Sequence, residues 1–342
     1  MDTGRIIKVH IKNNHASPDT FPPTIEGEAV FTITRERYEE FAASQADVAK
    51  HLDVFIDWDL DNFYESMASA EVLVTWDLPT ENLREVAPNL RWIHIIGAGA
   101  EHLCPLDWLP DNVTVVNNRG AHADKGGEFA LMGVLMLHNH MPAIIANQGR
   151  AHWESLYSTP IEGKTALIVG TGHIGRGAGR RLKMLGVRVL GISRHGASID
   201  EVDEIYPTTH LDELLPRADF LFLSTPLTPE TENLIDRRRQ RLMKRGAGVI
   251  NVGRAGTMDY EALVDNLESG HFCGAIIDVF DPEPLPANSP LWQAPNLLVT
   301  PHVSADDGDS YVSMTLDLVF ANMRRYLGGE TLINAVRPDL GY

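Results

Sequence analysis

The sequence is poor in cysteine. Only Cys104 and Cys273 occur in 342 residues, and neither has a CxxC partner or a neighbouring set of metal-ligand residues. Two isolated thiols exclude a disulfide framework and favour a reducing compartment. We therefore expect neither a disulfide scaffold nor a metal site.

Long apolar segments and net positive charge are also missing. No run approaches the ~18 apolar residues of a membrane helix, and residues 1–14 lack the apolar core of a signal peptide. The formal net charge of −18 argues against nonspecific binding to nucleic acid, which depends on basic surface. These observations predict a soluble, cytoplasmic protein without nucleic-acid or membrane partners, although a local basic pocket can still bind a small anion.

The most informative stretch lies between residues 163 and 196. A β-branched apolar run, Thr165–Val169, precedes a glycine cluster, a helical segment over 176–185 and a second apolar run over 187–192. This order of strand, tight turn, helix and strand is typical of a dinucleotide-binding βαβ unit. The stretch therefore predicts a site for a nucleotide cofactor.

The three glycines of the turn have separate expected tasks. Gly170 permits the tight turn, Gly172 allows backbone N–H groups to approach a pyrophosphate, and Gly175 lets the helix pack closely on the strand. The N-terminus of the helix then offers unpaired N–H groups and the positive end of its dipole to the anion.

The end of the second strand of this unit bears on the choice of nicotinamide cofactor. An acidic residue ~20 positions after the glycines would bind the ribose 2′-hydroxyl of NAD. Here the position is Ser193, followed by Arg194 and His195. No carboxylate repels a 2′-phosphate, and a guanidinium can pair with it. We expect a preference for NADP(H), with NAD(H) use as the alternative if Arg194 only covers the adenine ring.

The regular alternation of strands and helices after Lys164 predicts a doubly wound parallel sheet. The six expected strands are Thr165–Val169, Val187–Ile192, Asp219–Ser224, Gly248–Val252, Gly274–Val279 and Leu297–Thr300. A single long helix over 123–147 precedes them. Its His138 and His140 are two residues apart, so they point in different directions and cannot easily share a metal.

The first 117 residues predict a smaller α/β domain. Its expected strands are Arg5–Ile11, Glu28–Ile33, Leu52–Ile56, Glu71–Val74, Arg91–Ile95 and Val113–Val116. Thr34 is the expected N-cap of a helix to Lys50, and Thr80 that of a helix over 81–87. A last helix over 310–327 ends at Gly328 and returns to this domain. The expected domains are therefore 1–118 with 306–342, and 119–305.

Three residues with catalytic chemistry follow successive strands of the second domain. They are Arg254, Glu283 and His302. In such sheets, ligands bind at the carboxyl ends of the strands. Hydride addition to the ketone of a 2-oxo acid creates an oxyanion, which His302 can protonate. Glu283 would raise the pKa of that histidine, and Arg254 can bind the substrate's carboxylate and carbonyl oxygens with its planar fork.

The chain resembles the D-isomer-specific 2-hydroxyacid dehydrogenase family over nearly its whole length. The matching motifs are GTGHIGR at 170–176 and the segments 218–235, 243–256, 274–286 and 289–304. The resemblance implies a Rossmann domain with a smaller, discontinuous flavodoxin-like α/β substrate domain. It also implies that Arg254, Glu283 and His302 are the catalytic set, in the roles given above.

The resemblance adds further site residues. It implies that Asp278 contacts the nicotinamide carboxamide, that the backbone over 225–227 borders the cofactor, and that the loop 97–100 holds the substrate carboxylate through its N–H groups. The expected substrate-binding residues are Ala98, Gly99, Arg254 and His302. The expected cofactor-binding residues are Gly170, Gly172, His173, Ile174, Gly175, Ser193, Arg194, Thr225, Pro226, Val252, Gly253 and Asp278.

The sequence departs from the family pattern at two places, and the resemblance also implies an oligomeric state. Glu101 stands where the family's substrate loop has aspartate, and Gly126–Gly127–Glu128 replaces a small residue–Ala–Glu triplet. Two adjacent glycines weaken a helix start. The resemblance implies a homodimer formed through this helix, with Trp153 reaching toward a neighbouring subunit's site.

The sequence therefore favours an NADP(H)-linked reductase of a small 2-oxo acid, of the glyoxylate or hydroxypyruvate kind. One alternative is a relative with another hydride donor. Formate dehydrogenases carry glutamine in place of Glu283, whereas phosphite dehydrogenases share the catalytic trio. The other alternative is a nucleotide-sensing binding protein of the same fold, like the transcriptional corepressors, although no low-complexity tail or partner-binding extension is present.

Overall fold

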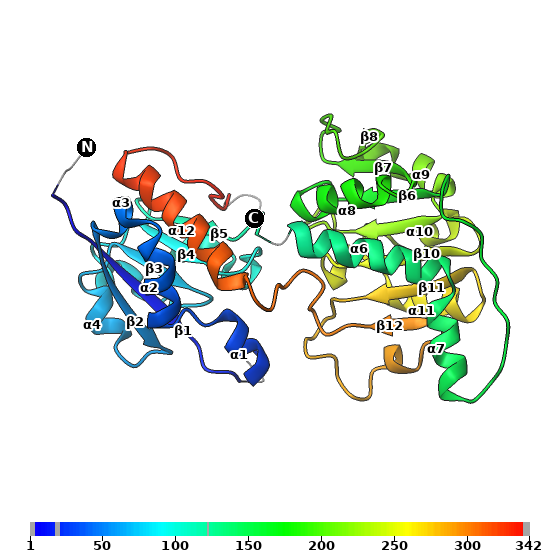
Figure 1. Ribbon diagram of the computed structural model, residues 1–342, viewed down its shortest axis with the longest axis horizontal. Helices are drawn as coiled ribbons and strands as arrows, with labels where there is room; N and C mark the ends of the chain where they lie inside the picture. The colour runs from blue at the N-terminus through cyan, green and yellow to red at the C-terminus, as the bar shows by residue number, and fades with distance from the viewer. Residues whose placement is uncertain (1–3, 18–20, 122, 338–342) are drawn as a thin grey trace. The chain divides into compact units, whose positions relative to one another are not determined.

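The computed structural model describes residues 4–17, 21–121 and 123–337, which divide into two compact units (Figure 1). Unit 1 consists of Met1–Ala121 together with Asp307–Tyr342, and unit 2 is His122–Asp306. Each unit is built on a parallel β-sheet with helices packed against it. The architecture is the α/β class that the alternating apolar runs predict.

Unit 2 contains a parallel sheet in the order β12-β11-β10-β9-β6-β7-β8. Its strands are β6 (Thr165–Val169), β7 (Arg188–Ser193), β8 (Glu204–Pro207), β9 (Phe220–Leu223), β10 (Ala247–Asn251), β11 (Phe272–Ile277) and β12 (Leu297–Val299). The order reverses direction between β6 and β9, which is the switch point where a doubly wound sheet binds its ligand. The six strands predicted for this domain are present within about two residues of their expected bounds.

Strand β8 was missing from the prediction. Its four residues, Glu204–Pro207, are all half-buried at the edge of the sheet, and they include glutamate and proline. A short edge strand needs no apolar run, so its sequence carries no hydrophobic signal.

Both faces of this sheet are covered. Along β6, Leu167 and Val169 join one apolar cluster while Ala166 and Ile168 join another on the opposite face. The α-helices of the unit are α6 (Ala123–His138), α7 (Met141–Gly149), α8 (His173–Lys183), α9 (Leu211–Leu214), α10 (Arg237–Leu242) and α11 (Tyr260–Glu268). Short 3₁₀ turns are η3 (Thr208–His210), η4 (Leu215–Arg217), η5 (Ala255–Thr257) and η6 (Pro290–Gln293).

The prediction of one helix over 123–147 was wrong. The segment forms α6 and α7, which bend by 68° at their junction. His140 adopts a left-handed backbone with φ of 57°, and Pro142 stands in the first turn of α7. Among the described helices no single one meets the length and apolarity needed to cross a membrane. The bent pair α6 and α7, taken together, meets these two criteria by length and composition only.

The adjacent glycines Gly126 and Gly127 lie inside α6 rather than weakening its start. A Cβ on Gly127 would lie 2.6 Å from the backbone of Gly177 in α8, and a Cβ on Gly177 would lie 2.1 Å from the carbonyl oxygen of Ala123. The two helices therefore pack backbone to backbone, which only glycine allows at these positions.

Unit 1 contains a five-stranded parallel sheet in the order β2-β1-β3-β4-β5, the order of flavodoxin-like folds. Its strands are β1 (Ile7–Asn13), β2 (Leu52–Trp58), β3 (Val72–Thr75), β4 (Trp92–Ile95) and β5 (Thr114–Asn117). The helices are α1 (Ile25–Phe31), α2 (Arg35–Ala43), α3 (Ala46–Ala49), α4 (Phe63–Met67), α5 (Leu83–Val86) and α12 (Tyr311–Leu327), with 3₁₀ turns η1 (Glu101–Leu103) and η2 (Leu106–Trp108).

Three predictions for unit 1 were wrong. Residues 28–33 were expected to form a strand, but most belong to α1, because Thr24 caps that helix by accepting from the N–H of Gly27. The helix expected from Thr34 to Lys50 breaks into α2 and α3 at 44–45. Thr34 does cap α2, whereas α5 begins after Asn82 and Thr80 does not cap it.

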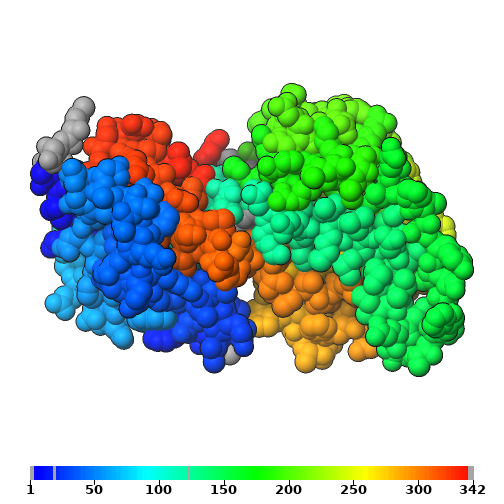
Figure 2. Space-filling model, in the orientation of Figure 1, coloured from blue at the N-terminus to red at the C-terminus, as the bar shows by residue number. Residues whose placement is uncertain are grey.

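The C-terminal helix α12 completes unit 1, as its sequence pattern predicts. Its Leu316 and Phe320 pack in one apolar cluster with Val9 of β1 and Val74 of β3. In Figure 2 the red C-terminal segment accordingly lies against blue residues from the start of the chain. The helix runs from the N-cap Ser310 to the C-cap Gly328.

Candidate active site

Arg254, Glu283 and His302 follow three neighbouring strands, β10, β11 and β12, at the carboxyl edge of the sheet in unit 2. The structure brings two of them into direct contact, because Nδ1 of His302 lies 2.7 Å from Oε2 of Glu283. The guanidinium of Arg254 donates from Nη1 to the carbonyl oxygen of Gly253 at 2.8 Å. Its charge also helps to lower the pKa of Glu283.

The His302–Glu283 pair keeps a proton available on the imidazole. Burial by itself would lower the pKa of His302, but the hydrogen bond and negative charge of Glu283 outweigh it, so the net pKa is raised above 6.5. For Glu283, burial would raise the pKa, but His302, the N–H of Phe280 and the charge of Arg254 together lower it below its ordinary value. The pair therefore favours an imidazolium next to a carboxylate, and 49% of the His302 side chain remains exposed to receive a substrate.

The carboxylate of Asp278 holds the loop that carries His302. Asp278 is fully buried, and it accepts hydrogen bonds from Oγ1 of Thr300 at 2.6 Å and from the N–H groups of Val303 at 3.0 Å and Ser304 at 3.1 Å. Between these anchors His302 adopts φ of 52°, a left-handed backbone that needs such support. This loop-holding contact was not expected from the sequence.

The glycine motif forms the turn between β6 and α8. Gly170 has φ of 99°, and a Cβ there would lie 2.8 Å from the backbone of Ser224. A Cβ on Gly175 would lie 2.1 Å from the carbonyl oxygen of Gly170, so the helix packs tightly on the turn. Gly172 is the N-cap of α8 without a side-chain cap, and a Cβ there would meet no atom within 4 Å. His173 and Ile174 form the first turn of the helix, which starts three residues earlier than predicted.

The loop after β9 provides an independent test of fit for a dinucleotide. Oγ1 of Thr225 is buried, and it has no hydrogen-bond partner among the residues that the structure describes. A Cβ on Gly253 would lie 2.6 Å from the carbonyl oxygen of Thr225, so this loop and the turn after Val252 pack closely. Pro226 is half-buried beside them. A buried hydroxyl without a partner next to an open helix N-terminus fits a polar cofactor.

Ser193 ends strand β7, where the second strand of the βαβ unit was expected to select the cofactor. Its Oγ accepts a hydrogen bond from the N–H of Gly196 at 3.0 Å, which fixes the turn. Arg194 and His195 are exposed on this turn. Their side chains therefore stand at the strand end that reads the adenosine ribose in this fold.

The predicted substrate loop, residues 97–100, follows β4 in unit 1. Asn117 donates from Nδ2 to the carbonyl oxygen of Ala98 at 2.8 Å, and the N–H of Asn118 donates to the carbonyl oxygen of Gly97 at 2.9 Å. Ala98 and Gly99 are half-buried. With these carbonyls held, the loop has a defined backbone, as an N–H nest for a carboxylate requires.

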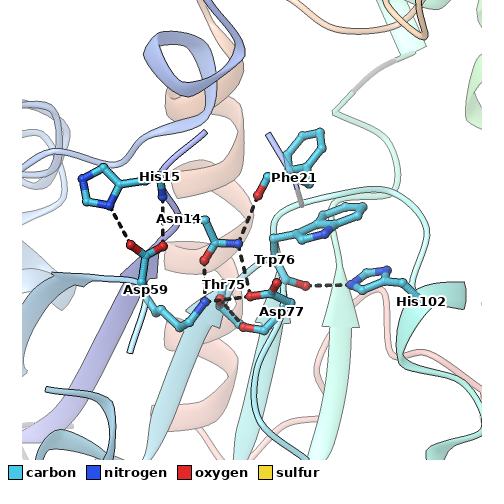
Figure 3. Close-up of polar contacts among 9 residues, drawn as sticks. Asn14, His15, Phe21, Asp59, Thr75, Trp76, Asp77 and His102 are labelled. Atoms are coloured by element: carbon cyan, nitrogen blue, oxygen red, sulfur yellow. Dashed lines mark hydrogen bonds and ion pairs between the residues drawn. The ribbon is translucent and has the colours of Figure 1, made fainter. Parts of the chain in front are cut away.

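Sequence reasoning missed an aromatic stack beside this loop. The Trp76 ring stacks on His102 at 4.1 Å and 7°, and its centroid lies 4.3 Å from that of Phe21 (Figure 3). A Cβ on Gly97 would lie 2.4 Å from Cζ3 of Trp76, so the indole edge lies directly on the loop. An open cavity of about 570 Å³ adjoins these rings. The available signal was the Trp76–Asp77 pair, which begins two residues after the predicted strand Glu71–Val74.

An ion pair between a buried lysine and a half-exposed aspartate lies at the same edge of the sheet in unit 1. Nζ of Lys12, at the end of β1, lies 2.7 Å from Oδ1 of Asp77, and the Lys12 side chain is only 3% exposed. Asn14 donates from Nδ2 to the same carboxylate at 3.1 Å and to the carbonyl oxygen of Phe21 at 3.0 Å (Figure 3). The network ties the Phe21 segment to the loop after β3.

The remaining predicted features lie away from these clusters. Trp153 is 94% exposed on the irregular segment after α7, and Tyr157 on the same segment is 86% exposed. Nε2 of His138 donates to the carbonyl oxygen of Thr159 at 2.5 Å. Within the described ranges no group of three or more His, Cys, Asp or Glu side chains is arranged to hold a metal ion.

Comparison with known proteins agrees with this geometry. The family model for the NAD-binding domain of D-isomer specific 2-hydroxyacid dehydrogenases matches residues 131–304. A glyoxylate reductase from Thermofilum pendens is 32% identical over 257 residues, which cover 72% of this chain and 74% of that protein.

Solved structures are similar over almost the whole chain. A D-isomer specific 2-hydroxyacid dehydrogenase from Xanthobacter autotrophicus, in complex with NADPH and MES, has a TM-score of 0.81 at 27% identity and covers 99% of this chain and 100% of its own. An NADPH-dependent glyoxylate/hydroxypyruvate reductase from Sinorhizobium meliloti, in complex with NADP and sulfate, has a TM-score of 0.77 at 28% identity. The match covers 98% of this chain and 100% of that chain.

Proposed function

The chain belongs to the D-isomer specific 2-hydroxyacid dehydrogenase family, and on that premise we propose that it reduces a small 2-oxo acid of the glyoxylate or hydroxypyruvate kind to the D-2-hydroxy acid with NADPH. The observation that carries the proposal is the contact of 2.7 Å between His302 and Glu283 at the strand ends that also present Arg254. The glyoxylate reductase and the NADPH-dependent glyoxylate/hydroxypyruvate reductase among the relatives support this substrate class.

The three side chains divide the chemistry of ketone reduction. The reduced nicotinamide supplies the hydride when it is bound. Arg254 binds the substrate carboxylate and polarises the carbonyl oxygen through its planar guanidinium. The imidazolium of His302 gives its proton to the oxygen as negative charge develops there. Glu283 keeps His302 protonated and aligned through the hydrogen bond at Nδ1, which leaves Nε2 for the substrate.

The protonation state of His302 bears on the rate of reduction. A raised pKa increases the protonated fraction of His302 at a given pH, and the protonated form is the one needed for reduction. The usual reduced state of the NADPH pool favours the same direction. We therefore expect reduction to lose rate as the pH rises through the raised pKa of His302.

Removing the acid tests this function. In His302→Ala, oxidation of NADPH in the presence of glyoxylate or hydroxypyruvate, followed at 340 nm, should fall by about 10²–10⁴-fold. NADPH binding, followed by the quenching of protein fluorescence, should be retained. Full turnover in this variant would remove His302 from the mechanism. Tight cofactor binding by the unmodified protein without turnover on any 2-oxo acid would instead favour the nucleotide-sensing alternative.

The cofactor preference rests on Arg194, since Ser193 and Arg194 occupy the position where a carboxylate would select NAD. The bound NADPH and NADP of the two structural relatives support the proposal. In Arg194→Ala, the ratio of kcat/KM with NADPH to that with NADH should fall about 10- to 100-fold, because a guanidinium–phosphate hydrogen bond is lost. An unchanged ratio, or a clear NADH preference before mutation, would contradict the assignment.

The proposal extends to a cytoplasmic homodimer. Trp153 and Tyr157 are exposed on the segment after α7, and Met132 of α6 and Ile145 of α7 are exposed as well. Exposed large apolar side chains of this kind favour a protein interface. A dimer mass in light scattering supports it, and a monomer at micromolar concentration contradicts it.

A further inference from the structure

A chain of hydrogen bonds joins the turn of Arg254 to Glu283 through residues that have no expected role in the reaction. It begins at Asn251, the fully buried last residue of β10. Oδ1 of Asn251 accepts from the N–H of Gly253 at 3.0 Å, and Nδ2 donates to the carbonyl oxygen of Arg254 at 3.2 Å. Asn251 therefore fixes the backbone at the N–H of Gly253 and at the carbonyl of Arg254.

The same Nδ2 group donates to the hydroxyl of Tyr260 at 3.0 Å. Tyr260 is the first residue of α11, and its hydroxyl donates in turn to the carbonyl oxygen of Val279 at 2.9 Å. Burial raises the pKa of Tyr260, so the hydroxyl keeps its proton and remains a donor throughout the neutral range.

The peptide between Val279 and Phe280 contacts both the Tyr260 hydroxyl and the carboxylate of Glu283. Its carbonyl accepts from Tyr260, and its N–H donates to Oε1 of Glu283 at 2.7 Å. The other oxygen of Glu283 pairs with His302 at 2.7 Å. One peptide unit is thus held on one side by a tyrosine and holds the catalytic carboxylate on the other.

We propose that Tyr260 is a positioning residue for the proposed reaction: through the peptide 279–280 it orients Glu283 against His302 and links that pair to the backbone of Arg254. A peptide whose carbonyl accepts a hydrogen bond becomes a stronger donor at its N–H. Tyr260 therefore strengthens the bond from Phe280 to Glu283 without touching substrate or cofactor. This inference rests on the proposed function for its catalytic meaning, whereas the geometry stands without it.

Other charges also act on His302 and must stay constant in the test. Glu283 and Asp278 raise the pKa of His302, Arg254 lowers it, and the carboxyl of Asp306 interacts with it as well. Removing the Tyr260 hydroxyl removes none of these charges, although it also removes the contact with Asn251, which holds the Arg254 turn. A weaker contact with Glu283 lowers the pKa of His302, whereas moving the Arg254 charge away raises it, so a fall in this pKa reports the position of Glu283.

The test is Tyr260→Phe, which keeps the ring that packs near Phe280 at 6.4 Å between centroids. The imidazole of His302 is titrated by NMR in both proteins and assigned by comparison with His302→Gln. The pKa of His302 should fall by a few tenths of a unit to about one unit, as expected for one lost hydrogen bond. The alkaline limb of kcat for 2-oxo acid reduction should move down by the same amount.

Tyr326→Phe provides the matched control. The Tyr326 hydroxyl also donates to an acceptor, Oε2 of Glu71 at 3.0 Å, but it belongs to unit 1. This control should leave the titration of His302 unchanged. An unchanged or raised pKa of His302 in Tyr260→Phe, even with a lower Tm, would overturn the inference and leave Tyr260 with a purely structural role.

The two readouts separate this inference from the proposed function. If the protein reduces no 2-oxo acid, the proposed function fails, while the NMR titration still decides whether Tyr260 acts on His302. If turnover is present and the pKa of His302 does not move, the function stands and the positioning role fails.

Discussion

The two units place histidine in opposite environments. In unit 2, His302 is half-exposed, faces Glu283, and has a raised pKa. In unit 1, His10 and His94 lie on the buried strands β1 and β4, and burial lowers the pKa of each to about 4. A carboxylate partner stabilises the imidazolium, whereas an apolar sheet excludes it.

This difference separates the proposed catalytic histidine from packed ones. The ring of His10 packs near Phe55 and Phe63, and neither ring nitrogen has a partner among the described residues. His94 pairs only one nitrogen, Nε2, with Oδ1 of Asn118 at 2.7 Å. Residue type therefore says little about function at these positions; the partner of the ring decides it.

The largest expected effect is on the acid stability of unit 1. The pKa values of His10 and His94 are about 4 in the folded protein and 6.5 in the unfolded chain, so only the unfolded chain takes up these protons between the two values. Stability should fall as the pH drops from 6.5 to 4, by up to about 3 kcal/mol for each histidine. Urea titrations at pH 7 and pH 5, analysed for each unit, measure the loss.

The variant His10→Leu should make the free energy of unfolding less dependent on pH. It removes one of the two buried imidazoles and places an apolar side chain in the same buried position. His15→Leu is the control, since His15 is exposed beside Asp59 and its pKa is raised rather than lowered. The pKa shift of His302 is opposite in direction to that of His10. The contribution of His302 to stability is therefore present at low pH and disappears as the pH rises through its raised pKa. Equal slopes in His10→Leu and the unmodified protein would show that His10 is not held neutral.

The second effect concerns the guanidinium in unit 2. In Arg254→Lys the positive charge remains, but the planar fork that binds two oxygens is lost. We expect kcat/KM for the 2-oxo acid to fall about 10- to 100-fold, since hydrogen bonds to charged groups are worth about 1.5–3 kcal/mol. NADPH affinity should change little. A variant with unchanged kcat/KM would show that charge alone, rather than bidentate geometry, binds the substrate.

The sequence predicted unit 2 more completely than unit 1 for a physical reason. Buried parallel strands such as β6 and β10 are continuous apolar runs, and their ends carry the glycines and charged residues that chemistry requires. The edge strand β8 lacks both signals and was missed. The contact between His302 and Glu283 was predicted because both follow adjacent strands, whereas the hydroxyl contact of Tyr260 depends on the rotation of α11, which no local pattern encodes.

Unit 1 offers a different lesson. Its aromatic stack brings together Phe21, Trp76 and His102, which are far apart in the sequence and lie in two loops and the short 3₁₀ turn η1. Composition cannot bring such residues together, because their contact depends on loop conformations. The segment 28–33 was mistaken for a strand for a related reason. The N-cap Thr24, rather than the apolar pattern, determines that most of this segment belongs to helix α1.

The smallest expected effect concerns this stack and the choice of substrate. The Trp76 edge lies on Gly97 at the start of the predicted substrate loop, so it limits the space beside a carboxylate bound there. In Trp76→Leu we expect kcat/KM for 4-methyl-2-oxopentanoate, relative to glyoxylate, to rise about tenfold, the range that added apolar space gives. Both substrates are compared with NADPH at saturating concentration.

Trp58→Leu is the matched control for this experiment. Trp58 ends β2 at the same edge of the sheet, but its ring stacks on His15 at 4.3 Å. The same loss of indole there should leave the ratio of the two substrates unchanged. If both variants changed the ratio equally, general loosening of unit 1 would explain the effect; if neither did, Trp76 would not limit substrate size. A change confined to Trp76→Leu would assign substrate size to unit 1, in contrast to the chemistry proposed for Arg254, Glu283 and His302 of unit 2.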